Sequence, residues 1–383
     1  GLFAATMAMA SPSPIIPMRV LVDKDAAFGE LRAPDDALYF REENGRAWKK
    51  HGPRSRVASR RGKIELDGVV TDASGAYFRG GVSTRAPIEV GPHRYPGALR
   101  LTARENSLLL TNIVPLELYL AGTVGSEMPP GWPLEALKAQ AVASRSYALY
   151  MHAHPRDPLY DLDRTVLDQV YGGAKKGMVR VEKALAETRD EVLVYGDAVV
   201  KAYYHSRCGG STDAPEAVWG RPERGPFGTV PCEPCRRTPS PWSTFVSWEE
   251  LKRKLEVPFA TEWFEKRWPS GRLAWLSLPK TNARWSGETL RKVLGYGRLK
   301  STQFRWSASA AGVFVDGVGF GHGVGMCQWG ARAMALAGAD YRRILSHYYP
   351  GARVARASDV TRAKKPTTSP APESARTHTA RRQ

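Results

Sequence analysis

Short runs of alternating apolar and polar residues, separated by clusters of glycine, proline and aspartate, fill the first third of this 383-residue chain. Alternation with a period of two is typical of half-buried strands, and the interrupting residues favour turns. Strands are therefore predicted at 19–22, 63–70, 88–90, 98–102 and 107–114. The part of the chain from residue 18 to residue 113 is expected to be rich in β-structure.

The pattern changes to helical spacing after residue 114. A short helix is predicted at 115–122, and the Ala-, Leu-, Lys- and Gln-rich run from Leu134 onward predicts a longer one. Pro133 suits the first helical position, because its missing N–H would be unpaired there anyway. Between the two helices, Glu127 lies in a Pro/Gly-rich segment that predicts a rigid elbow.

Two cations accompany this acid. Lys138 and Arg145 lie two turns apart on the longer helix, so both are expected on one side of it, near Gln140. An acid in a rigid turn beside two cations suits chemistry on charged sugars. The alternative is an exposed loop glutamate next to a solvated basic face, and this segment alone leaves both interpretations open.

The rest of the chain mixes short strands with helices. Strands are predicted at 168–173, 191–204, 304–306 and 312–315, and helices at 180–188, 248–255, 289–294 and 328–337. The predicted fold class is therefore α+β, a mixed globular core of short strands with an active-site helix, in one domain at 18–352 whose catalytic core is 114–352. Residues 353–383 are rich in Pro, Ser, Thr and Arg, a composition that predicts a disordered basic tail.

Glycine alternates with other residues from Gly317 to Gly325. In an extended strand this pattern leaves one face as bare backbone, which permits close approach of a ligand. Tight packing against a neighbouring strand is the alternative. A phosphate-binding loop is excluded because no Lys-Ser/Thr pair follows the glycines. His322 in this segment and His205 earlier would each, taken singly, more often be structural than catalytic.

The chain has four cysteines, Cys208, Cys232, Cys235 and Cys327. Cys232-Glu-Pro-Cys235 is a normal half-site for zinc, which the other two cysteines would complete, with His205 as a replacement ligand. Two disulfides would suit an exported protein, and free buried thiols are the third alternative. The cysteines are expected to be a structural staple, by zinc or by disulfides, and not nucleophiles.

The net charge is +18 and the isoelectric point is near 9.8, so the surface attracts polyanions. Nucleic acid is disfavoured because no zinc-finger spacing, RNP-type strand or basic zipper accompanies the charge. The chain contains no run of about 18 apolar residues, so no membrane span is predicted. Residues 1–10 are apolar and end Ala8-Met9-Ala10, like the second half of a secretory signal, although a frayed apolar N-terminus is the alternative. Residues 1–17 are thus expected to be a signal remnant and lead-in, and the protein to be exported to the periplasm or cell envelope.

Several separated segments, in the same order, resemble the SpoIID/LytB family of peptidoglycan-remodelling proteins. They are 114–122, 127–129, 135–143, 204–210, 286–287, 299–302, 319–326 and 347–351, so the resemblance covers most of the chain. Members of the SpoIID type are lytic transglycosylases that cut glycan strands stripped of stem peptides. Members of the LytB type are described as enhancers of a wall amidase.

The resemblance implies that Glu127 is the catalytic acid and that no cofactor is required for catalysis. It also implies a set of substrate contacts: Lys138, Gln140, Arg145, Gln169, Tyr171, His205, Ser206, His322 and Gln328. The implied partners are peptidoglycan glycan strands and a wall amidase, with no nucleic acid. The alternative function is a non-catalytic amidase enhancer that binds denuded glycan.

Two departures from the family pattern concern the cysteines and zinc. Cys327 stands where the family usually has serine before Gln-Trp-Gly, and Cys232-Glu-Pro-Cys235 offers it a partner. The zinc-binding insertion of some sporulation members is absent. The metal site of those members is therefore not carried over to this chain.

Overall fold

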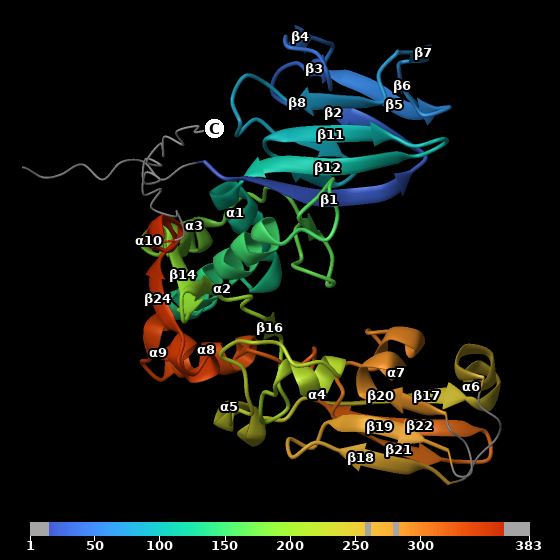
Figure 1. Ribbon diagram of the computed structural model, residues 1–383, viewed down its shortest axis with the longest axis vertical. Coiled ribbons are helices and arrows are strands. Elements are labelled where there is room, and N and C mark those ends of the chain that lie inside the picture. Colours follow the sequence, from blue (N-terminus) through green and yellow to red (C-terminus); the bar gives the residue numbers. More distant parts are fainter. Residues whose placement is uncertain (1–14, 257–261, 279–282, 364–383) are drawn as a thin grey trace, which may run out of the picture.

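The computed structural model describes residues 15–256, 262–278 and 283–363, and these residues form an α+β fold, which confirms the predicted class (Figure 1). The expected signal sequence and the chain after residue 363 lie outside the described residues. Figure 1 shows a β-rich N-terminal part, a helical middle, and a second β-rich part at the opposite end.

Two sheets make up the N-terminal part. The first has the strand order β13 (Leu162–Asp163), β1 (Pro17–Ala26), β12 (Leu108–Pro115), β11 (Ala98–Ala103), β8 (Gly75–Arg79), β3 (Tyr39–Glu42) and β4 (Lys49–Lys50). The second has the order β10 (His93–Tyr95), β9 (Ile88–Val90), β2 (Phe28–Arg32), β5 (Arg54–Arg60), β6 (Lys63–Leu66) and β7 (Val69–Val70). Apolar side chains of both sheets, such as Phe78 and Leu99 from the first and Val57 and Ile64 from the second, share one core.

The middle part is built around one long helix. It contains α1 (Leu116–Glu127), α2 (Leu134–Ala153), α3 (Val179–Glu187), α8 (Gln328–Leu336), α9 (Tyr341–Tyr348) and α10 (Ala357–Ala363), with a sheet of β15 (Ala198–Val199), β14 (Glu191–Tyr195) and β24 (Arg353–Arg356). Most of α2 is buried, and α1, α3, α8, α9 and β14 pack around it. This helix therefore forms the centre against which the other elements of the middle part pack.

A second hydrophobic core lies in the part between residues 241 and 318. Its sheets have the orders β17 (Pro241–Ser247), β22 (Gly312–Val318), β21 (Phe304–Ala308) and β18 (Phe264–Arg267), β19 (Leu273–Ser277), β20 (Arg284–Ser286), with α6 (Trp248–Leu255) and α7 (Gly287–Leu294) alongside. Leu251 of α6, Leu290 of α7 and Val313 of β22 belong to this core, which is separate from the core around α2. The helices α4 (Pro215–Trp219) and α5 (Glu233–Arg237) precede this part in the chain, and the parallel pair β16 (Tyr204–His205) and β23 (Met326–Cys327) joins the segments on either side of it.

Five predictions from the sequence need correction. The helix predicted at 115–122 continues to Glu127, so this acid ends α1 instead of lying in an elbow, and Pro133 is the N-cap of α2 and not its first residue. Residues 168–173 form a loop and not a strand, and the strand predicted at 191–204 is broken into β14, β15 and β16. Arg353–Arg356 pairs with β14 as β24, so regular structure continues past the expected start of the tail.

Candidate active site around Glu127

Glu127 is the last residue of α1, and its carboxylate is held by neutral donors from three other segments. The backbone N–H of Val170 donates to its Oε1 at 2.7 Å, and the Tyr204 hydroxyl and the Gln328 side chain are positioned to donate to it and so to lower its pKa. Burial raises the pKa of Glu127 above its ordinary value, and these three hydrogen bonds oppose the rise. A carboxyl group that keeps its proton closer to neutral pH is suited to general acid catalysis.

A chain of hydrogen bonds fixes the groups that contact Glu127. Gln169 donates from Nε2 to the Tyr204 hydroxyl at 3.0 Å and accepts from the Tyr119 hydroxyl at 2.9 Å. Since the Tyr204 oxygen already accepts from Gln169, its own proton is free to be donated to Glu127. On the other side, Gln328 donates to Gln140 Oε1 at 3.3 Å. The structure thus brings Gln140, Gln169 and Gln328, three of the substrate contacts that the resemblance implied, together with Glu127.

His205 and His322 contact the backbone of the segments that position Tyr204. His322 Nε2 lies 2.9 Å from the Tyr204 carbonyl oxygen, and its Nδ1 accepts from the Val324 N–H at 3.1 Å. His205 Nδ1 lies 3.1 Å from the Val324 carbonyl oxygen. Burial lowers the pKa of His205 to about 3 and also lowers that of His322, so both rings are neutral at pH 7. Two neutral rings bonded to backbone act as positioning residues for Tyr204.

The glycines that precede β23 serve this packing. The segment is not the extended strand that the sequence predicted, because Gly319, Gly321, Gly323 and Gly325 all have φ between 67° and 109°. A Cβ on Gly325 would lie 2.0 Å from the Tyr203 carbonyl oxygen, and one on Gly321 would lie 2.8 Å from the His205 Cβ. The alternative of tight packing against a neighbouring segment is therefore the one that the structure shows.

Lys138 and Arg145 are placed in ion pairs that hold helices together. Arg145 is 1% exposed, and its guanidinium forms two 2.9 Å bonds with the Glu117 carboxylate and donates to the carbonyl oxygens of Thr188 and Glu191. Lys138 contacts Glu135 at 2.8 Å and Glu187 at 2.6 Å. The interpretation of these cations as substrate contacts is corrected, because their charges are already paired within the fold.

Tyr171 and Ser206 were also predicted to contact substrate. Tyr171 is 1% exposed, and its hydroxyl donates to Asn112 Oδ1 at 2.8 Å while its ring packs 5.0 Å from that of Tyr119. It is a core residue that anchors the loop carrying Gln169, so the prediction is corrected. Ser206 is half-buried in the segment after Tyr204, and its carbonyl oxygen accepts from the Trp329 N–H at 3.1 Å.

A group of aromatic and cationic side chains beside the site was missed. Trp132, in the loop that follows Glu127, packs edge-on against Trp329, which follows Gln328, with 5.1 Å between ring centroids. The Arg207 guanidinium lies 3.8 Å from the centre of the Trp329 ring, and that of Arg332 lies 5.3 Å from it. These four half-buried residues are here called the Trp–Arg cluster. The signal that could have found them is their position within a few residues of Glu127, Tyr204 and Gln328.

The structure also gathers all four cysteines. Their Sγ atoms lie within 4.8 Å of one another and all four residues are buried, a grouping that could hold a metal ion. His205, considered as a replacement ligand, bonds to backbone as described above and does not belong to this group.

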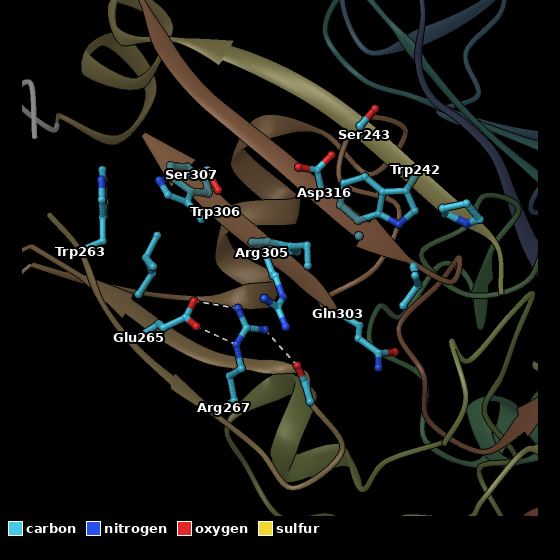
Figure 2. Close-up of a pocket in the computed structure, with 16 residues that line it drawn as sticks. Trp242, Ser243, Trp263, Glu265, Arg267, Gln303, Arg305, Trp306, Ser307 and Asp316 are labelled. Carbon is cyan, nitrogen blue, oxygen red and sulfur yellow. Dashed lines mark hydrogen bonds and ion pairs between the residues drawn. The ribbon is translucent and has the colours of Figure 1, made fainter. Parts of the chain in front are cut away.

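A pocket of about 1190 Å³ lies elsewhere, between the two sheets of the second core (Figure 2). Trp263 and Trp306 stand close together at one side of it, with ring centroids 5.3 Å apart, and Arg267 pairs with Glu265 at 2.7 Å on another. Its lining residues all come from 241–318, whereas the contacts of Glu127 come from the loop before α3, β16 and α8. The pocket is therefore distinct from the Glu127 site.

Comparison with known proteins decides the family. The SpoIID family model, described as Stage II sporulation protein, matches residues 104–195. Stage II sporulation protein D of Bacillus amyloliquefaciens is 30% identical over 274 residues, which cover 64% of this chain and 75% of that protein. The chain belongs to the SpoIID/LytB family. The segment matched by the family model holds Glu127, Gln140 and Gln169, while Tyr204 and Gln328 come from farther along the chain.

Two further relatives extend the SpoIID/LytB comparison. An uncharacterized protein of Brachyspira hyodysenteriae is 34% identical over 294 residues, which cover 74% of this chain and 78% of that protein. A protein of Bacillus subtilis named amidase enhancer is 28% identical over 292 residues, which cover 61% of this chain but 39% of that protein. Within the described part of the chain, no helix is both long and apolar enough to cross a membrane.

Proposed function

We propose that this protein is a lytic transglycosylase that cleaves peptidoglycan glycan strands lacking stem peptides, in the cell envelope. The observation that carries the proposal is Glu127, a single carboxyl group whose pKa is raised by burial and whose hydrogen-bond partners are neutral. A dual acid and base needs a pKa near working pH, since it must both give and take a proton.

The reaction begins with protonated Glu127 donating its proton to the glycosidic oxygen that leaves C1 of N-acetylmuramic acid. The C1–O bond breaks, and the carboxylate left behind then takes the proton of the C6 hydroxyl of the same sugar. The C6 oxygen closes on C1, so the product is an anhydro ring and no water is consumed. Glu127 ends protonated, as it began.

Tyr204 and Gln328 have a defined part in this cycle. Both donate to the Glu127 carboxylate and so stabilise its charged form between the two proton transfers. Burial raises the pKa of Tyr204, which keeps its hydroxyl proton available for this bond. Because neutral donors fix the carboxylate without holding it permanently ionised, the same group is able to act first as acid and then as base.

The Trp–Arg cluster supplies a physical reason for preferring denuded strands. Loss of a stem peptide leaves a free lactyl carboxylate on each muramic acid, so a denuded strand is a regular polyanion. Arg207 and Arg332 would offer positive charge from the segments that carry Tyr204 and Gln328, and Trp132 and Trp329 would offer aromatic surface to the sugar rings. The net charge of +18 adds attraction at longer range.

The proposal is tested by incubating the protein with glycan strands that an amidase has stripped of stem peptides, and analysing the products by mass spectrometry. We expect fragments ending in anhydro-muramic acid. Reducing ends in place of anhydro ends would mean hydrolysis, and intact strands would remove the enzyme function.

A second candidate function is stimulation of a wall amidase without cleavage. It is supported by the similarity to the Bacillus subtilis amidase enhancer. The same residues would then bind denuded glycan and present it to the amidase as partner. Intact strands in the assay above, together with faster amidase turnover when the protein is added, would favour this second function.

The pH dependence of cleavage should respond to Tyr204. Its hydrogen bond lowers the pKa of Glu127, so Tyr204→Phe should raise that pKa further. Since a general acid works while protonated, the alkaline limb of the kcat/KM profile should move to higher pH. Tyr203→Phe is the matched control, because the Tyr203 hydroxyl donates to Glu223 at 2.7 Å instead. Equal profiles for both variants would contradict the assigned bond.

Glycan binding should weaken with salt through the Trp–Arg cluster. Arg332→Gln should lower the affinity for denuded strands by up to about fivefold, as expected for a partly exposed charge, and should reduce its salt dependence. Arg343→Gln is the control, because it removes the same charge from an exposed position on α9, and it should leave the affinity nearly unchanged. Titrations by fluorescence anisotropy at low and high salt measure both, and equal losses in the two variants would show that only net charge matters.

A further inference from the structure

The four cysteine sulfurs have the spacing of ligands around one metal ion. A zinc ion bound by thiolates at about 2.3 Å in a tetrahedron separates its sulfurs by about 3.8 Å. The four Sγ atoms here all lie within 4.8 Å of one another, and Cys235 and Cys327 are 3.6 Å apart. We propose that Cys208, Cys232, Cys235 and Cys327 form a mononuclear tetrathiolate zinc site. This inference does not depend on the proposed activity.

The ligands come from three segments that the fold brings together independently. β16 and β23 pair in parallel, which places the Cys208 segment beside Cys327. The Cys232 N–H donates to the Gly210 carbonyl oxygen at 2.9 Å, so the loop carrying Cys232 and Cys235 is tied to the same place. Cys235 then follows Cys232 by one tight turn, as in zinc half-sites of the CxxC type. The site is therefore formed by backbone pairing and not by the sulfurs alone.

Hydrogen-bond donors surround the sulfurs as they do in thiolate sites. The Cys208 N–H points at Cys327 Sγ at 3.3 Å, the Gly210 N–H at Cys208 Sγ at 3.4 Å, and the Gly330 N–H at Cys327 Sγ at 3.4 Å. The Tyr348 hydroxyl lies 3.3 Å from Cys232 Sγ. Such outer contacts orient metal ligands and stabilise the negative charge on sulfur.

The charge of the site is also matched. Binding one Zn²⁺ releases the four thiol protons to solvent and leaves a net charge of −2 on the ion and its thiolates. Arg272 is fully buried, and its guanidinium donates to the carbonyl oxygens of Cys208 and Ser211 and to the Thr302 hydroxyl. A guanidinium buried against the Cys208 backbone offers a compensating positive charge to this dianion.

The zinc site would position the Glu127 network. Cys327 immediately precedes Gln328 and is the N-cap of α8, and Cys208 follows Tyr204 by four residues. A single ion would therefore fix the two segments that supply Tyr204 and Gln328 to Glu127. The ion is structural, because four protein ligands leave no open coordination position.

The test uses the full chain purified under reducing conditions and then dialysed. We expect about one zinc per chain by mass-spectrometric elemental analysis, and tetrahedral ligand-field bands when Co²⁺ replaces zinc. Release of the ion by a thiol-modifying reagent, followed with a chromogenic chelator, would identify the thiolates as ligands. A metal-free chain whose intact mass shows that the four thiols have lost their hydrogens to form two disulfides would overturn the proposal. Iron in place of zinc would overturn it as well.

Two variants keep the test independent of folding. Cys327→Ser retains a good N-cap, so α8 should still form. Loss of an outer contact lowers metal affinity by about 10–100-fold. The zinc affinity of Cys327→Ser should fall by more than this, because a ligand itself is removed. Tyr348→Phe is the control: it loses the outer contact to Cys232 and should keep about one zinc per chain, with faster release to the chelator. Full zinc in folded Cys327→Ser would overturn the ligand set.

Discussion

Replacing Glu127 with glutamine is expected to lower the rate of glycan cleavage by about 10²–10⁴-fold, the range that one positioned proton transfer supplies. Glutamine has nearly the same shape and still accepts the bond from the Val170 N–H, so the site should keep its structure. It has no acidic proton to give to the leaving oxygen and no carboxylate to take one from the C6 hydroxyl. The loss should therefore appear in kcat, while the affinity for denuded strands remains.

The control is Glu182→Gln on α3, an exposed glutamate for which cleavage should be unchanged. Rates are followed by mass-spectrometric counting of anhydro-muramic ends. If Glu127→Gln cleaved as fast as the wild type, the acid would be another residue. If the variant lost glycan binding and cleavage together, Glu127 would be a binding group, and the enhancer function would become the better account.

The part of the site that the sequence predicted is the part formed by local patterns. Glu127 and Gln140 lie on either side of the start of α2, which Pro133 and the Ala-rich run predict. Gln169 and Gln328 were found only through resemblance, because no spacing in the chain says that segments so far apart meet. The parallel pairing of β16 with β23 brings one of these segments to the other, and this is a tertiary event.

The errors have a common physical cause, which is burial. Periodicity placed Lys138 and Arg145 on one side of a helix, but it could not show that α2 is covered on most of its surface. A cation on a covered face must be paired, and Glu117, sitting near the start of α1, supplies the pair for Arg145. The same limit affected Tyr171, whose polar hydroxyl is satisfied in the core by Asn112.

The prediction of an extended strand for the glycine-rich segment 317–325 failed for a different reason. Alternation has the same appearance in an extended strand and in a chain that turns at each glycine, because it reports spacing and not φ. The positive φ values at Gly321 and Gly325 allow the segment to pack against Tyr203 and His205 without side chains in between. The strands in the first two sheets were predicted only where apolar alternation is strong; β5 (Arg54–Arg60), with its arginines, was missed.

The second large effect concerns stability. Arg145→Met should lower the free energy of unfolding by about 3 kcal/mol, the lower end of the cost of breaking a buried ion pair. The lower end applies because the Glu117 side chain is 37% exposed and water can solvate it once the partner is gone. The carbonyl oxygens of Thr188 and Glu191 lose a donor as well.

Lys138→Met is the matched control on the same helix. Its partners Glu135 and Glu187 are 31% and 38% exposed, so the loss should be about 1 kcal/mol or less. Denaturant unfolding measures both variants, and a glycan titration measures binding by the folded fraction. A stable Arg145→Met with weakened glycan binding would restore Arg145 as a substrate contact. An unstable variant with unchanged affinity would mean that Arg145 serves the fold, and would leave recognition of the anionic strand to other cations such as Arg207 and Arg332.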